Sequence, residues 1–204
     1  MKGLYLVTPD WDDTTRLLRV TEAALRGGAA LLQYRHKTAS PALRREQAGA
    51  LLALCRDYRR PLIINDHLAL CTELDADGLH LGGTDIGLAQ ARAALGPAKI
   101  IGASCYGDLA LARSASAAGA SYVAFGGFFP STVKKYPVTT PVEILARAQE
   151  QVPLPSVAIG GITPFNAGPL VAAGADMVAA ITSVYLAPHP EAAALAFHKI
   201  FNTQ

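Results

Sequence analysis

The feature of this sequence that most constrains its fold is a short module that occurs three times. The end of a helix-like segment is followed by glycine and then at once by an apolar, strand-like run, at 24–31, 117–123 and 172–178. A glycine at such a point can take the left-handed conformation that ends a helix. Because the connection is so short, we expect each helix to pack antiparallel against the strand that it feeds.

Strand-like and helix-like segments alternate along the whole chain. Eight apolar runs are typical of strands covered on both faces, at 3–8, 30–35, 61–65, 78–81, 100–104, 122–126, 156–159 and 177–181. Helix-like segments lie at 14–26, 41–58, 68–73, 88–95, 109–118, 141–150, 165–173 and 190–201. Eight repeats with no linker predict an α/β fold, a single (β/α)8 TIM barrel over residues 1–204. An open doubly wound sheet is the alternative, but no glycine-rich fingerprint follows the first strand.

Composition narrows the classes of partner and location. With 204 residues, 51% of them apolar, the chain is long enough for one sizeable core. A net charge of +2 argues against nucleic acid and membrane surfaces as partners. Three widely separated cysteines, an N-terminal run unlike a signal peptide and no long apolar stretch favour a cytoplasmic protein with reduced thiols. A homo-oligomer is compatible with the sequence, which leaves the oligomeric state open.

Polar residues and glycines gather where the predicted strands end, which is where barrels of this kind carry their functional groups. Gly160 and Gly161 follow the seventh run, and Thr182 and Ser183 follow the eighth. Glycine lets backbone N–H groups approach phosphate oxygens, so this pair of segments favours a phosphate site. A tight turn is the alternative explanation for two adjacent glycines.

Basic residues follow two other runs. Arg35 and Lys37 are two residues apart on an extended segment, so both side chains can meet one polyanion. Lys134 and Lys135 lie in a loop that runs from 126 to about 140, and loops of that length at a barrel mouth are often functional lids. Solvated surface charges are the alternative for each pair, most plausibly for Lys135.

Two carboxylates end the third and fourth runs. Asp66 and Asp85 would lie on adjacent strands, and carboxylate oxygens with a pyrophosphate suit Mg²⁺ better than zinc. A helix N-cap is the alternative role for either aspartate. His67 and His80 also lie near strand ends, where a lone histidine is more often a hydrogen-bonded partner than a base.

The order and spacing of these residues resemble the thiamine-phosphate synthase family over nearly the whole chain. The resemblance rests on Gln33-x-Arg35-x-Lys37, Ile64-Asn65-Asp66, Asp77-Gly78-Leu79-His80-Leu81-Gly82-x-x-Asp85, Gly102-Ala103-Ser104, Phe129-Pro130-Ser131-x-x-Lys134-Lys135 and Ile159-Gly160-Gly161-Ile162. It implies a transferase that joins hydroxymethylpyrimidine pyrophosphate to thiazole phosphate, with release of pyrophosphate.

The resemblance also implies a role for each matching residue. Gln33 would contact the pyrimidine, and Arg35, Lys37, Asn65 and Lys134 would hold the pyrophosphate. Asp66 and Asp85 would bind Mg²⁺, and Gly161, Thr182 and Ser183 would bind the thiazole phosphate. Ser104, Ser131 and Thr132 complete the expected substrate-binding set, in which Lys134, Arg35 and Lys37 are the catalytic residues. Positive charge would stabilise the departing pyrophosphate, and the thiazole nitrogen, which carries no proton, would then attack without a general base.

Four positions differ from the residues usual in that family. Gly83 stands in place of a glutamine, Ser131 and Val133 in place of threonines, and His67 in place of an arginine or aspartate. Two other functions therefore stay open. One is a thiazole tautomerase on the same fold, and the other is a non-catalytic protein that binds thiamine phosphate.

Overall fold

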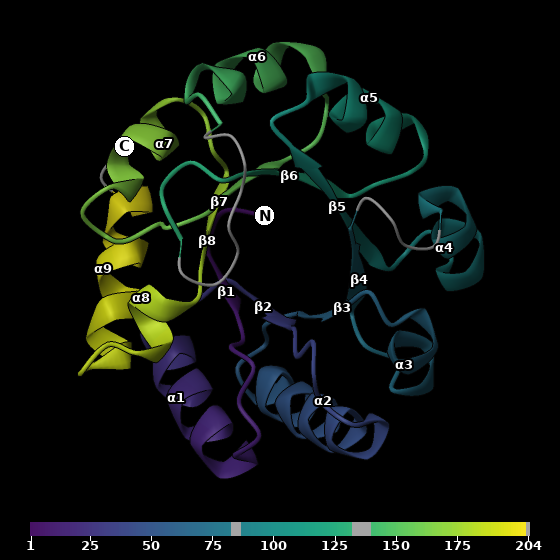
Figure 1. Cartoon of the computed structure of the whole chain (residues 1–204), viewed down its shortest axis with the longest axis vertical. Coiled ribbons are helices and arrows are strands. Elements are labelled where there is room, and N and C mark those ends of the chain that lie inside the picture. The colour runs from purple at the N-terminus through teal and green to yellow at the C-terminus, as the bar shows by residue number, and fades with distance from the viewer. Residues whose placement is uncertain (83–86, 132–139, 203–204) are drawn as a thin grey trace.

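The computed structural model describes residues 1–82, 87–131 and 140–202. Eight parallel strands pair in chain order, and β8 pairs with β1, so the sheet closes and the predicted (β/α)8 barrel is confirmed. Figure 1 looks along this barrel and shows the helices as an outer ring. The strands are β1 Gly3–Val7, β2 Leu31–Tyr34, β3 Leu62–Asn65, β4 Gly78–Leu81, β5 Ile100–Tyr106, β6 Tyr122–Gly126, β7 Ser156–Ile159 and β8 Met177–Ala180.

The helices alternate with the strands along the sequence. They are α1 Thr14–Arg26, α2 Pro41–Asp57, α3 Leu68–Glu73, α4 Leu88–Leu95, α5 Leu109–Ala117, α6 Glu143–Gln151, α7 Ala167–Ala172, α8 Thr182–Tyr185 and α9 Pro190–Asn202. The short α8 was not predicted, because four residues are too few to show helical periodicity. The chain ends on α9, which packs against α1 and so covers the junction between the first and last strands.

Local sequence signals explain where the helices begin and end. The Asp13 side chain caps α1 by accepting a hydrogen bond from the Arg16 N–H, at 2.9 Å, and Ser40 caps α2 in the same way ahead of Pro41. At the end of the repeated module, Gly28 and Gly174 have φ values of 94° and 107°. The expected left-handed glycines are therefore present, and each helix turns directly into the next strand.

Two layers of apolar side chains make up the core. The larger layer lies between the strands and the helix ring, while the smaller one fills the barrel itself. The barrel layer comprises Tyr5, Val7, Leu31, Ile63, Tyr122, Ala124, Val157, Met177 and Ala179. Side chains alternate between the two layers along each strand, as the pleat of a sheet requires. The same alternation turns the polar residues near the strand ends toward the inside of the barrel.

The amino-terminal end of the barrel is held by side-chain hydrogen bonds to backbone. Asp77 accepts from the Leu62 N–H and Asp176 from the Ser156 N–H, both at 2.8 Å. Arg92 donates to the carbonyl oxygens of Gly96 and Lys99, both at 2.7 Å. These bonds stabilise the amino-terminal end of the barrel. In barrels of this kind the functional groups lie at the opposite, carboxyl-terminal end.

The cysteines are buried and unpaired, as expected for reduced thiols. Burial raises the pKa of the Cys71 thiol to about 11 and that of the Cys55 thiol to about 12. Neither thiol is therefore ionised near neutral pH. Among the residues that the structure describes, no helix has the length and apolar character needed to cross a membrane.

Candidate active site

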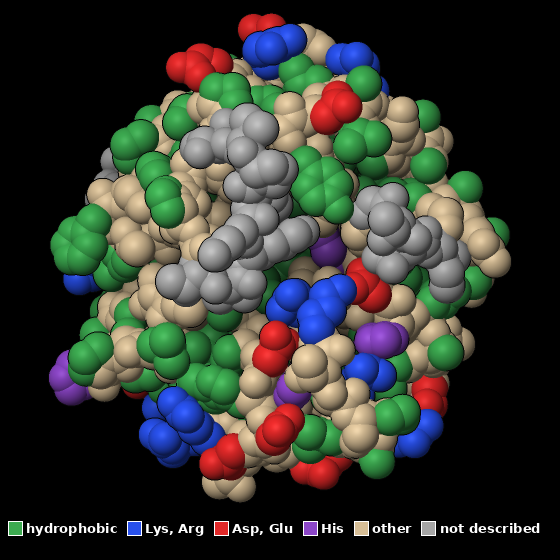
Figure 2. Space-filling view, in the orientation of Figure 1, with side chains coloured by type: hydrophobic (Ala, Val, Ile, Leu, Met, Phe, Trp, Pro, Cys, Tyr) green, Lys and Arg blue, Asp and Glu red, His purple; other side chains and the backbone are tan. Residues whose placement is uncertain are grey.

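A cavity of about 470 Å³ opens at the carboxyl ends of the strands. Residues from the ends of all eight strands or the segments that follow them line it, so it is formed only when the barrel closes. Figure 2 looks into this end, where basic and acidic side chains gather at the opening. Its size is typical of a pocket for a small molecule.

One wall of the cavity is basic and comes from the segments after β2 and β3. Arg35, Lys37, Asn65 and Asp66 all line it, which brings four of the predicted site residues together. The Lys37 ammonium forms an ion pair with Asp66, and the Asn65 amide donates to the same carboxylate oxygen at 2.6 Å. The wall therefore presents two cationic side chains and one carboxylate that is already oriented.

Asp66 has an unusual backbone conformation for a residue with a side chain. Its φ is 63°, in the left-handed region, and its side chain is only 14% exposed. The residue that caps α3 is His67, so the alternative role of Asp66 as the N-cap is wrong. A strained position that turns a carboxylate toward a cavity is a pattern found at functional sites.

Asp10, which follows β1, supports the basic wall from behind. Its carboxylate lies 3.5 Å from Nη1 of Arg35 and accepts a hydrogen bond from the Lys37 backbone N–H at 2.9 Å. Arg35 Nη1 is buried and makes no hydrogen bond with the described residues. The Asp10 ion pair leaves this buried donor without a hydrogen bond, which is costly, so the guanidinium can donate one to an anionic ligand. Sequence reasoning missed Asp10, because its segment shows no motif.

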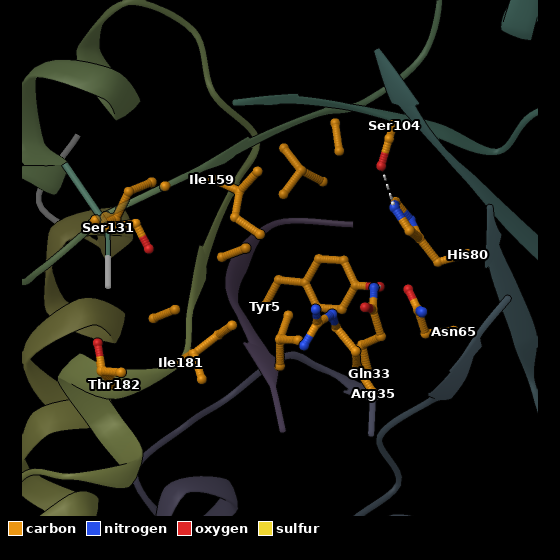
Figure 3. Close-up of a pocket in the computed structure, with 18 of the residues that line it drawn as sticks. Tyr5, Gln33, Arg35, Asn65, His80, Ser104, Ser131, Ile159, Ile181 and Thr182 are labelled. Atoms are coloured by element: carbon orange, nitrogen blue, oxygen red, sulfur yellow. Dashed lines mark hydrogen bonds between the residues drawn. The ribbon is translucent and has the colours of Figure 1, made fainter. Parts of the chain in front are cut away.

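The opposite wall is formed by the segments after β6, β7 and β8, where Gly160, Gly161, Ser131 and Thr182 line the cavity. Gly161 has a φ of 61°, and a Cβ atom there would lie 2.3 Å from the Pro130 carbonyl oxygen. The close approach of these two loops thus requires glycine. In Figure 3, Ser131 and Thr182 lie across the cavity from Asn65, Gln33 and Arg35.

Ser183 is the predicted site residue whose side chain turns elsewhere. Its hydroxyl donates to the Ile162 carbonyl oxygen at 2.8 Å, and the residue is not among those that line the cavity. The neighbouring Asn166 donates to the Gly161 carbonyl oxygen at 3.1 Å. These bonds hold the glycine loop and the start of α8 together, so any contact of Ser183 with a ligand would come from its backbone N–H.

The floor of the cavity joins an apolar half to a polar half. Ile159 and Ile181 line one half, whereas Tyr5, Gln33 and His80 lie in the other. Burial holds the pKa of the Tyr5 phenol well above its usual value, so it stays protonated. Tyr5 and the pocket residue Tyr106 were not predicted. Alternate residues of β1 face the inside of the barrel, and this period-two pattern could have predicted that Tyr5 points inward.

Three predicted site residues, Asp85, Thr132 and Lys134, lie outside the described residues, as do Gly83 and Val133. Within the described residues, no group of three or more histidine, cysteine or acidic side chains is gathered as for a metal. A magnesium ion bound with pyrophosphate needs only one or two protein carboxylates. The oriented Asp66 at the cavity therefore fits such an ion.

Comparison with known proteins identifies the family. A model described as thiamine monophosphate synthase matches residues 4–184. The chain is 65% identical to a thiamine-phosphate synthase of Janthinobacterium sp. (strain Marseille), over 98% of this chain and 97% of that one. It is 54% identical to the thiamine-phosphate synthase of Methylobacillus flagellatus, over 99% and 96% of the two chains. The solved thiamine phosphate pyrophosphorylase of Pyrococcus furiosus superposes with a TM-score of 0.88 at 32% identity, covering 98% of this chain and 96% of that one. The chain thus belongs to the thiamine monophosphate synthase family.

Proposed function

We propose that this chain is a transferase that couples hydroxymethylpyrimidine pyrophosphate to thiazole phosphate, giving thiamine phosphate and pyrophosphate. The observation that carries the proposal is the full-length identity of 65% to a thiamine-phosphate synthase. The cavity supports it independently, because its two walls offer separate places for two anionic groups at a distance from each other.

The basic wall suits the pyrophosphate. Arg35, Lys37 and Asn65 supply donors there, and Arg35 Nη1 is ion-paired with Asp10 at 3.5 Å but makes no hydrogen bond with the described residues. Negative charge on the pyrophosphate grows as its bond to the pyrimidine methylene breaks, so fixed cations stabilise the transition state more than the ground state. Arg35, Lys37 and the sequence-assigned Lys134 are therefore the proposed catalytic residues.

The glycine wall suits the thiazole phosphate. Gly161, Thr182 and the backbone of Ser183 are the proposed contacts, with Ser131 facing the same side of the cavity. The absence of a Cβ at Gly161 leaves its backbone accessible to phosphate oxygens. Thr132, outside the described residues, is proposed to act with Ser131.

Asp66 and Asp85 are the residues that would hold Mg²⁺. When bound together with pyrophosphate, the ion supplies positive charge to the leaving oxygens. The chain's own contribution is orientation, because Asn65 and Lys37 fix the Asp66 carboxylate at the cavity. Asp85 enters from the sequence alone.

The aminopyrimidine ring can carry positive charge on its methylene carbon once pyrophosphate leaves. Gln33 is proposed to bind this ring, and Ser104 lies at the same polar half of the floor. The thiazole nitrogen attacks with its lone pair and has no proton to lose, so the reaction needs no general base. The Tyr5 phenol, which lines the cavity, and the Tyr122 phenol hydrogen-bonded to it have pKa values raised by burial, so neither serves as a base.

The proposal treats residues 1–204 as one domain in the cytoplasm, acting on small molecules. The pairing of β1 with β8 supports a single unit, since the two ends of the chain complete one barrel. A thiazole tautomerase remains the second candidate, because the glycine wall alone would hold thiazole phosphate. The oriented Asp66 favours the synthase, since isomerisation of a thiazole requires no pyrophosphate site.

The test is to incubate the purified protein with both substrates and Mg²⁺ and to separate the products by chromatography. We expect thiamine phosphate and pyrophosphate in equal amounts. A parallel incubation with only the thiazole tautomer tests the second candidate. Isomerised thiazole without any thiamine phosphate would overturn the proposed coupling activity.

A further inference from the structure

A chain of four hydrogen bonds crosses the inside of the barrel and links five strands. The Gln33 amide donates to Tyr5 Oη at 2.7 Å, and Tyr5 Oη lies 2.6 Å from Tyr122 Oη. Tyr122 Oη lies 2.9 Å from His80 Nδ1, and His80 Nε2 lies 2.9 Å from Ser104 Oγ. The last of these bonds is drawn in Figure 3. Gln33 and Ser104, at the two ends of this hydrogen-bonded series, both line the cavity.

The middle of this chain is held rigidly. Tyr5 and Tyr122 are fully buried and meet edge to face, while His80 stacks on Tyr122 at an interplanar angle of 20°. Gly102 makes room for the phenol, because a Cβ there would lie 2.0 Å from Tyr122 Cζ. Burial also keeps both phenols protonated by raising their pKa values. Each tyrosine therefore has one proton to donate and must donate it along the chain.

The direction of donation at one end determines the direction at the other. Since Gln33 donates to Tyr5, Tyr5 donates to Tyr122 and Tyr122 to His80 Nδ1. His80 Nδ1 then accepts this bond, so the ring proton is on Nε2 and is donated to Ser104. The Ser104 hydroxyl keeps its own proton and one lone pair for the cavity, and Gln33 keeps its carbonyl oxygen and a second N–H. If the Gln33 amide were reversed, every bond would reverse, and Ser104 would offer only lone pairs.

We propose that Tyr5, Tyr122 and His80 are positioning residues that lock Gln33 as an acceptor and Ser104 as a donor, and thereby select a 4-aminopyrimidine over a 4-oxopyrimidine. This inference rests on the proposed function, in which the pyrimidine occupies this half of the floor. An amino group donates and the adjacent ring nitrogen accepts, which matches the locked pattern. In the oxo ring the oxygen accepts and the adjacent nitrogen donates, so the ring oxygen meets the carbonyl oxygen of Gln33 and the Ser104 proton finds no acceptor on that nitrogen.

Selection of the amino ring has a chemical purpose in the proposed reaction. The 4-amino group is the electron donor that stabilises positive charge on the methylene carbon, and a 4-oxo ring does so less well. A ring that bound but ionised slowly would occupy the site as an inhibitor. Buried groups that are left unpaired by the wrong ring provide strong rejection, since a site built for one hydrogen-bond pattern discriminates sharply against its absence.

The test is calorimetric binding of two unreactive, methylene-bridged analogues of the pyrimidine pyrophosphate, one 4-amino and one 4-oxo. We expect the wild-type protein to bind the amino analogue more tightly by on the order of 100-fold, the combined scale of two mismatched hydrogen bonds. Tyr122→Phe removes the central hydroxyl without changing the ring. It frees His80 to take either tautomer, and the ratio should fall about tenfold.

Tyr185→Phe is the matched control. Tyr185 is also buried, with 3% of its surface exposed, and its hydroxyl lies 2.7 Å from Thr21 Oγ1; the residue does not line the cavity. It should lower stability in a similar way but leave the binding ratio unchanged. NMR of histidine labelled with ¹⁵N, assigned against His80→Gln, gives a second readout. We expect the proton on Nε2 of His80 in the wild type and a mixture of tautomers in Tyr122→Phe.

The outcomes separate this inference from the proposed function. The inference would be overturned if folded Tyr122→Phe kept the wild-type binding ratio and the His80 proton stayed on Nε2. The hydrogen-bonded series would then not select the pyrimidine, whereas the proposed coupling activity would be unaffected. A wild-type protein that bound neither analogue would overturn both. A wild-type protein that bound the amino analogue selectively but formed no thiamine phosphate would overturn the coupling activity alone.

Discussion

Lys37 and Asp66 are ion-paired to each other across the segments that follow β2 and β3. In the proposed reaction they bind ligands of opposite charge, because Lys37 binds the pyrophosphate and Asp66 binds the metal ion. The pair therefore keeps both side chains at the cavity until substrate separates them. The pair is also partly open to solvent, so its own contribution to stability is small.

The first prediction concerns the carboxylate. Asp66→Asn keeps the shape of the side chain but removes its charge, and we expect the coupling rate to fall by ~100-fold or more, the scale of lost charge stabilisation at a reacting centre. Asp75→Asn is the control, because Asp75 also has a positive φ, 51°, and is hydrogen-bonded to Lys99 at 2.5 Å but does not line the cavity. Steady-state kinetics of both variants make the comparison.

A companion measurement tests the metal itself. Coupling should stop in excess EDTA and return when Mg²⁺ is added in excess of the chelator. Full activity in EDTA, or an Asp66→Asn variant as active as Asp75→Asn, would contradict the assignment of Mg²⁺ to this wall.

The second prediction concerns the support of Arg35. Asp10→Asn removes the carboxylate that lies 3.5 Å from the guanidinium, whose side chain is 19% exposed. The KM for the pyrimidine pyrophosphate should rise about five- to tenfold, because the guanidinium is no longer held by an opposite charge. Asp12→Asn is the matched control, since Asp12 is 85% exposed and contacts His36 instead. Equal KM values for the two variants would show that Asp10 does not position Arg35.

The third prediction concerns Gly161. Even Gly161→Ala should raise the KM for thiazole phosphate, and Gly161→Val more so, while the KM for the pyrimidine pyrophosphate changes less. The added Cβ would meet the Pro130 carbonyl oxygen at 2.3 Å and displace the loop that borders the cavity. Left-handed strain adds roughly 1–2 kcal/mol to the cost.

Gly96→Ala separates the effect of backbone strain from the effect of the Cβ contact with Pro130. Gly96 also has a positive φ, 75°, but a Cβ there would meet nothing within 4 Å. Gly96→Ala should therefore lose stability without any change in kinetics. An unchanged KM for thiazole phosphate in Gly161→Ala would move the phosphate site away from β7 and β8.

The fourth prediction addresses the opposite end of the barrel. Arg92→Ala leaves the Gly96 and Lys99 carbonyl oxygens without their donor and should lower the free energy of unfolding by about 2–4 kcal/mol. The kcat of the folded protein should not change. Arg113→Ala is the control, because the exposed Arg113 contacts Gln151 at the surface, and its cost should be below ~1 kcal/mol. Urea denaturation gives both values.

The sequence was sufficient for the barrel and for the basic wall. Short helix-to-strand turns leave few topologies open, and Arg35, Lys37, Asn65 and Asp66 stand directly at strand ends, where local position decides which way they face. The positions of Arg35, Lys37 and Asp66 follow from neighbouring residues in the sequence, whereas the role of Asn65 was expected only from the family resemblance.

Features that depend on closure of the barrel could not be predicted. Tyr5, Tyr122 and His80 are far apart in the chain and come into one hydrogen-bonded series only because β1, β4 and β6 face a common interior. Ser183 was expected at the phosphate, but its hydroxyl is bound to Ile162, whose position depends on how the β7 loop folds over. Pairings of this kind are tertiary, and no local pattern specifies them.

The most direct test of the proposed chemistry is the kcat of Lys134→Ala beside that of Lys135→Ala, two neighbouring residues of the same basic loop. Lys134 is assigned from the sequence to the departing pyrophosphate, so its loss should lower kcat strongly, by ~100-fold or more, because its interaction strengthens in the transition state. Lys135→Ala should leave kcat nearly unchanged. A near-normal kcat in Lys134→Ala would contradict the account of pyrophosphate departure given for this site.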